Sequence, residues 1–255
     1  MKIKFNRSAL QEALGLAVSV VPSRTPKPIL QCLRITTEGN VVKICATDLE
    51  VGITCLVHQV EIEKEGDVVV PADKFASIVR ESLDEIIELE AAESTVQITG
   101  SDSHFTIYGH EASQYPVVPG FEGDADFEID LGKLQEGVEC TNFAAAKEST
   151  RYALNGILWE VEGKKLTLVA TDGRRLAKAV ITLPAAGEVP NGRIIVPSKT
   201  MSLLDKIGAE ADAKVGVRFV DNQIVLGCGD VVINSNLVEG NFPKYEDIIP
   251  KDYNN

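Results

Sequence analysis

Residues 45–49, CATDL, and residues 169–173, VATDG, are two copies of one short pattern, about 124 positions apart. Further matched pairs keep the same order along the chain: LQE at 10–12 and 134–136, VVP at 69–71 and IVP at 195–197, YP at 115–116 and FP at 242–243. Matches that keep their order with little drift in spacing indicate an internal repeat. We therefore predict two homologous domains, at residues 1–120 and 125–250, joined by the glycine- and acid-rich residues 119–126.

Each predicted domain shows the same coarse order of elements. An alternating strand opens it, at residues 2–5 and 126–129, and a helix follows, which in the second copy begins after Asp130 as its N-cap. Glycine-containing turns at residues 38–40 and 162–164 join the next two strands. Helices and strands in this mixed order, with short connections, predict an α+β fold in which two helices pack on antiparallel sheets in each domain.

The predicted helices carry basic residues on faces that otherwise hold small ones. In the second copy one face of the first helix consists of Lys133, Gly137, Cys140, Ala144 and Lys147, and one face of the second helix of Lys199, Ser202 and Lys206. A lysine face is usually only a solvated face. Several such faces in a chain with a net charge of −13 are better explained by a polyanionic partner.

Composition excludes several classes of protein. The 255 residues are 44% hydrophobic, which is enough for a packed core, and no apolar run is long enough to span a membrane. The N-terminus has no signal-peptide pattern. The five cysteines are odd in number and have no CxxC spacing, which predicts reduced thiols in a cytoplasmic protein.

Motifs for catalysis are missing from the sequence. It has no P-loop, no GxGxxG and no GxSxG, and His58, His104 and His110 lack metal-binding spacing. Asp48 with Glu50, and Asp172, could be acid–base carboxylates, but Asp48 and Asp172 both follow the same Ala-Thr in the repeat, and an aspartate used twice at a strand end favours a turn-forming role. The sequence thus predicts a non-catalytic protein with no metal and no cofactor.

At this point the chain resembles a known family. ATDGRRLA at residues 170–177 is similar to the ATDGxRLA signature of the bacterial DNA polymerase III sliding clamp, the beta subunit and processivity factor. Supporting segments run through the chain in the family's order: RTPKPIL at 24–30, RYALNG at 151–156, IVP at 195–197 and FPKY at 242–245. The resemblance implies a DNA-clamp fold that encircles duplex DNA, with helices lining the hole, and that tethers the replicative polymerase. The partners it implies are double-stranded DNA, the DNA polymerase III catalytic subunit, the clamp loader, other clamp-motif proteins and a second copy in a head-to-tail ring.

The family has three domains, whereas this sequence covers the first two. The expectation is that the chain is a fragment that lacks the third domain; a truncated protein and a two-domain clamp that closes as a trimer are the alternatives. Two other classes of function remain open at the level of sequence. One is a peptide-binding scaffold without DNA, and the other is a hydrolase or transferase whose motif is not apparent.

Specific residues follow from the basic positions and from the resemblance. The expected DNA contacts are Arg24, Lys74, Lys133, Lys147, Arg151, Tyr152 and Lys199. The resemblance implies one wall of a partner-peptide pocket, at Leu154, Thr171, Gly173, Arg174, Arg175, Leu176, Pro243 and Ile248. It also implies a dimer contact at Phe105, Ile107 and Lys74. Glu148, Ala153 and Asp247 depart from the family's pattern and put the strength of the nearby contacts in doubt.

Overall fold

The computed structural model describes residues 1–147 and 149–249. Its first half contains helices α1 (Arg7–Val18) and α2 (Ala72–Glu81) and the strands β1 (Lys2–Asn6), β2 (Cys32–Glu38), β3 (Val41–Thr47), β4 (Val51–Val57), β5 (Val60–Lys64), β6 (Asp67–Pro71), β7 (Ile86–Ala92), β8 (Thr95–Thr99) and β9 (His104–Tyr108). The second half contains helices α3 (Leu131–Asn142) and α4 (Ser198–Leu204) and the strands β10 (Phe127–Asp130), β11 (Gly156–Glu162), β12 (Lys165–Thr171), β13 (Leu176–Thr182), β14 (Arg193–Pro197), β15 (Lys214–Val220), β16 (Gln223–Cys228) and β17 (Val231–Asn236).

The two halves have the same strand order. The first half orders its strands as β1-β7-β8-β9 and β4-β3-β2-β6, and the second half as β10-β15-β16-β17 and β13-β12-β11-β14. Neighbouring strands are antiparallel, and α1 contacts α2 as α3 contacts α4. Strand β5, which lies outside β1, has no counterpart among the described residues of the second half. The predicted α+β fold is confirmed.

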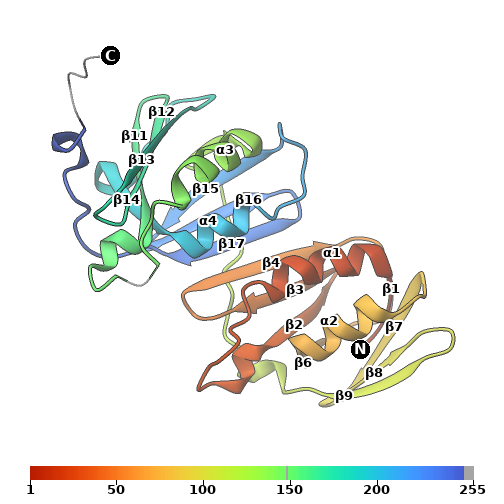
Figure 1. Ribbon diagram of the computed structural model, residues 1–255. Helices are drawn as coiled ribbons and strands as arrows, with labels where there is room; N and C mark the ends of the chain where they lie inside the picture. Colours follow the sequence, from red (N-terminus) through yellow and green to blue (C-terminus); the bar gives the residue numbers. More distant parts are fainter. Residues whose placement is uncertain (148, 250–255) are drawn as a thin grey trace.

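One sheet crosses the boundary between the halves. Strand β17 pairs with β4, from Val231 opposite Cys55 to Ser235 opposite Val51, and the pairing makes a single eight-stranded sheet. Figure 1 shows the four helices in front of the sheets, in a row that crosses both halves. The junction is therefore a backbone hydrogen-bonded sheet that carries helices on one side.

Alternating apolar residues hold the helices to these sheets. Ile3 and Phe5 of β1 are fully buried, as are Leu10 and Ala17 of α1. Period 2 in the strand and period 3.6 in the helix put each apolar set on one face, so both sets meet in one core. The apolar face of α1, with Leu10, Leu14 and Ala17, is buried, and Val21 lies beyond the end of the helix.

The starts of α1 and α3 differ: Asp130 is the N-cap residue of α3, as predicted, but its side chain makes no capping hydrogen bond. The side chain of Asn6 accepts a hydrogen bond from the backbone N–H of Ala9 at 3.1 Å and so caps α1. Asp130 occupies the same position before α3 but makes no side-chain capping bond. Its carboxylate contacts Lys133 at 2.5 Å and also contacts Lys214, and these ammonium groups hold the pKa of Asp130 below its usual range. Two nearby cations compete successfully for the carboxylate that would otherwise cap the helix.

Candidate nucleic-acid and partner interface

The repeated aspartates form the turns that position several predicted site residues. One oxygen of Asp48, Oδ1, accepts the N–H groups of Glu50 at 2.9 Å and Val51 at 2.8 Å. Asp172 accepts those of Arg174 at 2.9 Å and Arg175 at 3.1 Å in the same way, and these backbone donors lower its pKa. The turn-forming interpretation is confirmed, because each carboxylate is occupied by its own backbone.

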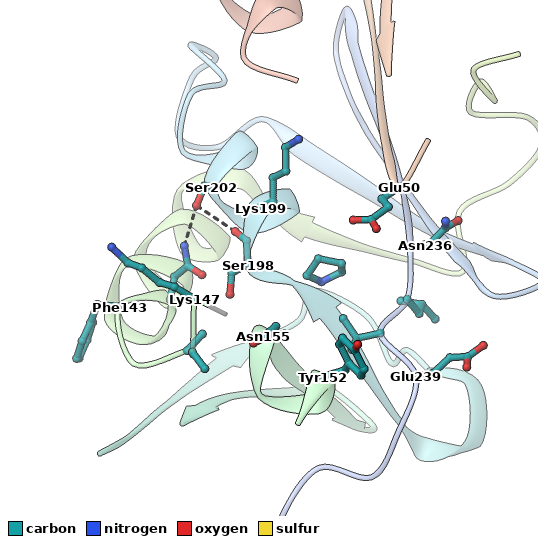
Figure 2. A pocket seen from close by; sticks show the side chains of 16 residues that line it. Glu50, Phe143, Lys147, Tyr152, Asn155, Ser198, Lys199, Ser202, Asn236 and Glu239 are labelled. Carbon is teal, nitrogen blue, oxygen red and sulfur yellow. Dashed lines mark hydrogen bonds between the residues drawn. The ribbon is translucent and has the colours of Figure 1, made fainter. Parts of the chain in front are cut away.

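A cavity of about 710 Å³ is lined by the end of α3, the loop after it, the start of α4 and the segment after β17, together with Glu50 of the first half. Three of the predicted DNA contacts line it: Lys147 from the loop after α3, Tyr152 from the next short helical turn, and Lys199 from the first turn of α4. Tyr152 is 72% exposed, so its ring is available to a partner. In Figure 2, Lys199 and Glu50 are drawn at the upper rim of this cavity, and Tyr152 and Glu239 at the lower rim. The fold thus gathers basic and aromatic side chains from separate segments around one hollow.

A hydrogen-bond chain shapes the floor of this cavity. The amide of Asn142 donates to Ser202 Oγ at 2.9 Å, and Ser202 Oγ donates to the carbonyl of Ser198 at 3.0 Å, as Figure 2 shows. These bonds tie the end of α3 to α4. Sequence reasoning missed Asn142 and Ser198, because neither belongs to a motif and they lie far apart along the chain. Glu239 was missed for the same reason, and the sequence suggested Glu50 only as a possible acid–base carboxylate.

The other predicted DNA contacts lie elsewhere. Arg24, Lys74 and Arg151 are exposed, in the segment after α1, on α2 and before the short turn that starts at Tyr152. Lys133 pairs with Asp130 and lines a separate cavity of about 320 Å³ between α3 and β13. The structure therefore brings Lys147, Tyr152 and Lys199 together but leaves Lys133 apart from them. Glu148 lies outside the described residues.

The expected basic face of α3 is only partly correct. The helix ends at Asn142, before Ala144 and Lys147, and Ala144 is fully buried. Gly137 is buried against Ile181 and Leu168, where a Cβ atom would lie 2.7 Å and 3.0 Å from their terminal methyl groups. Gly137 thus serves close packing of the helix on β12 and β13, whereas Cys140 is exposed and lines the cavity beside Lys133. Lys206 likewise follows the end of α4.

The predicted peptide-pocket residues gather around a second apolar cluster. Ala153, Phe242 and Tyr245 are buried there with residues of β11, β12 and β14, and Leu176 packs against them. Leu154 and Thr171 are buried, Leu176 and Pro243 are half-buried, and Gly173, Arg174 and Ile248 are exposed. Asp247 is exposed beside this surface. The half-buried and exposed members are the ones that a peptide can reach.

Arg175, expected in the peptide pocket, also makes contacts within its own half. Its guanidinium donates to the carbonyl of Phe143 at 2.6 Å and to Asp172 at 3.1 Å, and it lies 5.5 Å from the centre of the Phe143 ring. These contacts hold the loop after α3 against the turn that Asp172 forms. Both arginines are exposed, but Arg175 already makes these contacts, so Arg174 is the one whose guanidinium is not committed to Asp172 and Phe143.

The predicted dimer contacts fall on an open sheet edge. Strand β9 ends the five-stranded sheet, and Phe105 on it is 43% exposed beside a cavity of about 440 Å³. Ile107 is only 6% exposed and belongs to the core of its own half. Residues 105 and 107 are two positions apart on β9 and so share a face, but the core of its own half covers Ile107, whereas Phe105, near the start of the strand, stays accessible. The dimer contact at Ile107 stays a prediction. Lys74 on α2 is exposed.

Two general features bear on the class of protein. Among the described residues, no helix is both long and apolar enough to cross a membrane. Within the same part of the chain, no three His, Cys, Asp or Glu side chains come together as a metal site would require.

Two family profiles match the sequence in tandem. Residues 1–119 match the profile described as the DNA polymerase III beta subunit, N-terminal domain, and residues 128–244 match its central domain. The beta sliding clamp of Pseudomonas aeruginosa is 33% identical over 253 residues, which cover 98% of this chain and 68% of the relative. The beta sliding clamp of Escherichia coli K12 is 31% identical with the same coverage of both chains.

Solved structures agree with these matches. The DnaN sliding clamp of Pseudomonas aeruginosa bound to griselimycin superposes with a TM-score of 0.91 at 32% identity, over 99% of this chain and 68% of that one. The DNA polymerase III beta subunit of Thermotoga maritima gives a TM-score of 0.88 at 30% identity, over 98% and 68%. With both profiles in order and similarity along almost its whole length, the chain belongs to the bacterial beta sliding clamp family, the beta subunits of DNA polymerase III.

Proposed function

We propose that this chain acts as a sliding clamp, which encircles duplex DNA and tethers the DNA polymerase III catalytic subunit to it without catalysing a reaction itself. The observation that carries the proposal is the ordered match of two clamp-domain profiles along the chain. The row of helices on one side of the sheets supports it, because that side presents Lys147, Tyr152 and Lys199 around one hollow. Free cysteines at all five positions support a cytoplasmic location.

We further propose that residues 1–120 and 125–250 are the first two clamp domains. Their equal strand orders support this division, as does the linker, whose Phe121 packs over Gly216 and Gly227 of the second half. The chain corresponds to 68% of the length of its relatives, which leaves room for a third domain in a longer form.

The repeat also suggests how a ring is built. At the junction, β17 of one half pairs with β4 of the other. Strand order makes β9 the counterpart of β17, and β13 the counterpart of β4, and both end their sheets. An unpaired sheet edge is a ready template for another strand. We propose that β9 and β13 are the remaining ring contacts: they join chains directly in a trimer of two-domain chains, or through a third domain in the family's head-to-tail dimer.

The DNA contacts proposed are Arg24, Lys74, Lys133, Lys147, Arg151, Tyr152 and Lys199. Lysine and arginine contacts to phosphate make binding insensitive to sequence and steeply dependent on salt. Anisotropy of a labelled duplex should show weak binding to this chain, equal for unrelated sequences, that disappears as salt rises. The double variant Lys147→Met, Tyr152→Ala should weaken it further, whereas Lys43→Met, on the sheet strand β3, should not. Tight, sequence-selective binding at physiological salt would contradict the proposal.

A further inference from the structure

Lys199 joins the two halves through its side chain. It lies in the first turn of α4, yet its ammonium contacts the carboxylate of Asp48 and donates to the carbonyl of Val20 at 3.4 Å, and both partners belong to the first half. The side chain of Asp48 is 15% exposed and that of Lys199 is 44% exposed. A partner can therefore still approach the lysine from solvent, whereas the aspartate is largely covered.

The carboxylate of Asp48 divides its two oxygens between two tasks. Oδ1 accepts the N–H groups of Glu50 and Val51 and forms the turn, and Oδ2 contacts Lys199. In the second half Asp172 forms the same turn with Oδ1, but its Oδ2 accepts from Arg175 of the same turn at 3.1 Å. The turn alone thus requires only an oxygen acceptor at Oδ1, and the negative charge of Asp48 is directed at the lysine of the other half.

The lysine that Asp48 contacts lines the same cavity as Lys147 and Tyr152. A carboxylate and a DNA phosphate are both anionic oxygen acceptors that compete for an ammonium group. We propose that Asp48 is an internal competitor for Lys199, which weakens the contact of this lysine with the DNA backbone. The inference rests on the proposed clamp function. It explains how a basic position can face DNA and still bind it loosely enough to slide.

The substitution Asp48→Asn separates the two tasks, because the amide keeps Oδ1 for the turn and removes the charge. We expect the 255-residue variant to bind a labelled duplex at low salt about two- to fivefold more tightly than the wild type, the range for a partly exposed ion pair. A plot of log Kd against log salt should become steeper by up to about one unit, since one more lysine is free to contact phosphate. Asp172→Asn makes the same change in the equivalent turn and should leave both quantities unchanged.

The decisive test measures the effect of Asp48→Asn in a variant that already carries Lys199→Met. If Asp48 acts through Lys199, adding Asp48→Asn to this variant should change neither the affinity nor the salt slope. An equal gain in affinity with and without Lys199 would overturn the inference, since the effect would then be one of overall charge. An unchanged affinity of the folded Asp48→Asn protein would also overturn the inference, because the contact between Asp48 and Lys199 would then be purely structural.

Failure of the inference is separable from failure of the clamp function. If Lys147→Met, Tyr152→Ala weakens binding but Asp48→Asn has no effect, the DNA face stands and the competition does not. Absence of duplex binding in all variants would overturn both. Circular dichroism and thermal unfolding of each variant establish that a change in affinity is measured on folded protein.

Discussion

At the scale of single residues, equivalent positions of the repeat have taken different partners. Asp48 and Asp172 form the same turn with one carboxylate oxygen each. The second oxygen of Asp48 contacts Lys199 of the second half, whereas the second oxygen of Asp172 accepts a hydrogen bond from the nearby Arg175. Asn6 and Asp130 both precede a helix, but only Asn6 caps it. The two copies share the aspartate turns, in which the carboxylate bonds backbone N–H groups two or three residues away. Carboxylate oxygens that are not used for backbone bonds contact the nearest lysine or arginine.

We expect Asn6 to contribute to the stability of the protein by capping the first turn of α1. Replacing it by alanine leaves an N–H group of the first turn of α1 without its acceptor, so we expect Asn6→Ala to lower the free energy of unfolding by about 1 kcal/mol. Asn6→Ser keeps a capping oxygen and should lose only a fraction of that. Urea denaturation with fitted midpoints measures both; equal losses would show that the cap contributes nothing.

At the scale of elements, the glycines of the two first helices lie on different helix faces. Gly15 of α1 is exposed and a Cβ atom there would meet nothing within 4 Å. Gly137 of α3 is buried, and a Cβ atom there would collide with Ile181 of β13. A glycine in a helix costs about 1 kcal/mol of propensity relative to alanine, so its presence at Gly137 is explained by close approach to the sheet.

The same substitution at both glycines tests this difference. Gly137→Val should lower the free energy of unfolding by about 1–3 kcal/mol, because the added methyl groups overpack the interface of α3 with β13. Gly15→Val should be nearly neutral, since valine and glycine differ by only about 0.3–0.5 kcal/mol in helix propensity and the site is open. Chemical denaturation of the two variants beside the wild type measures the contrast. Similar losses at both sites would mean that helix propensity, and not packing, explains Gly137.

At the scale of the whole molecule, the pairing of β4 with β17 makes one sheet from two halves and leaves edges for further pairing. The surface around Leu176, Pro243 and Ile248 lies in the second half, next to the segment that follows β17. The resemblance to the family implies that this surface is one wall of a pocket that a third domain completes. This chain would then supply one wall only.

We expect a peptide with the clamp motif, glutamine followed by large apolar residues, to bind this chain weakly and a longer form with a third domain more tightly. Apolar anchors in an enclosed pocket carry most of a peptide's affinity, and one wall encloses them poorly. Leu176→Asp should abolish binding in the longer form, whereas Val117→Asp, at an exposed position just before the linker, should not. Isothermal titration measures the four affinities. Equally tight binding to both forms, or no loss with Leu176→Asp, would place the pocket elsewhere.

Much of the local structure follows from the sequence. The repeat, the glycine turns at 38–40 and 162–164, and the aspartate turns were all predictable because turn chemistry and side-chain periodicity act over a few residues. The ends of helices were less so: the expected face from Lys133 to Lys147 runs past the end of α3 at Asn142. The residue at which a helix ends and the hydrogen-bond partner of a side chain at its start depend on residues far along the chain, which the local pattern does not contain.

The sequence by itself therefore determined the duplication, the α+β class and the family. Only the tertiary structure decided that β17 pairs with β4, that Lys147, Tyr152 and Lys199 surround one cavity, and that Asp48 reaches Lys199. The physical reason is that the local pattern specifies which face of a strand or helix is buried. The partner of a strand edge or of a charged group is instead whichever group the folded chain brings within hydrogen-bonding distance. Residues 151 positions apart in the chain become neighbours only when the two halves dock.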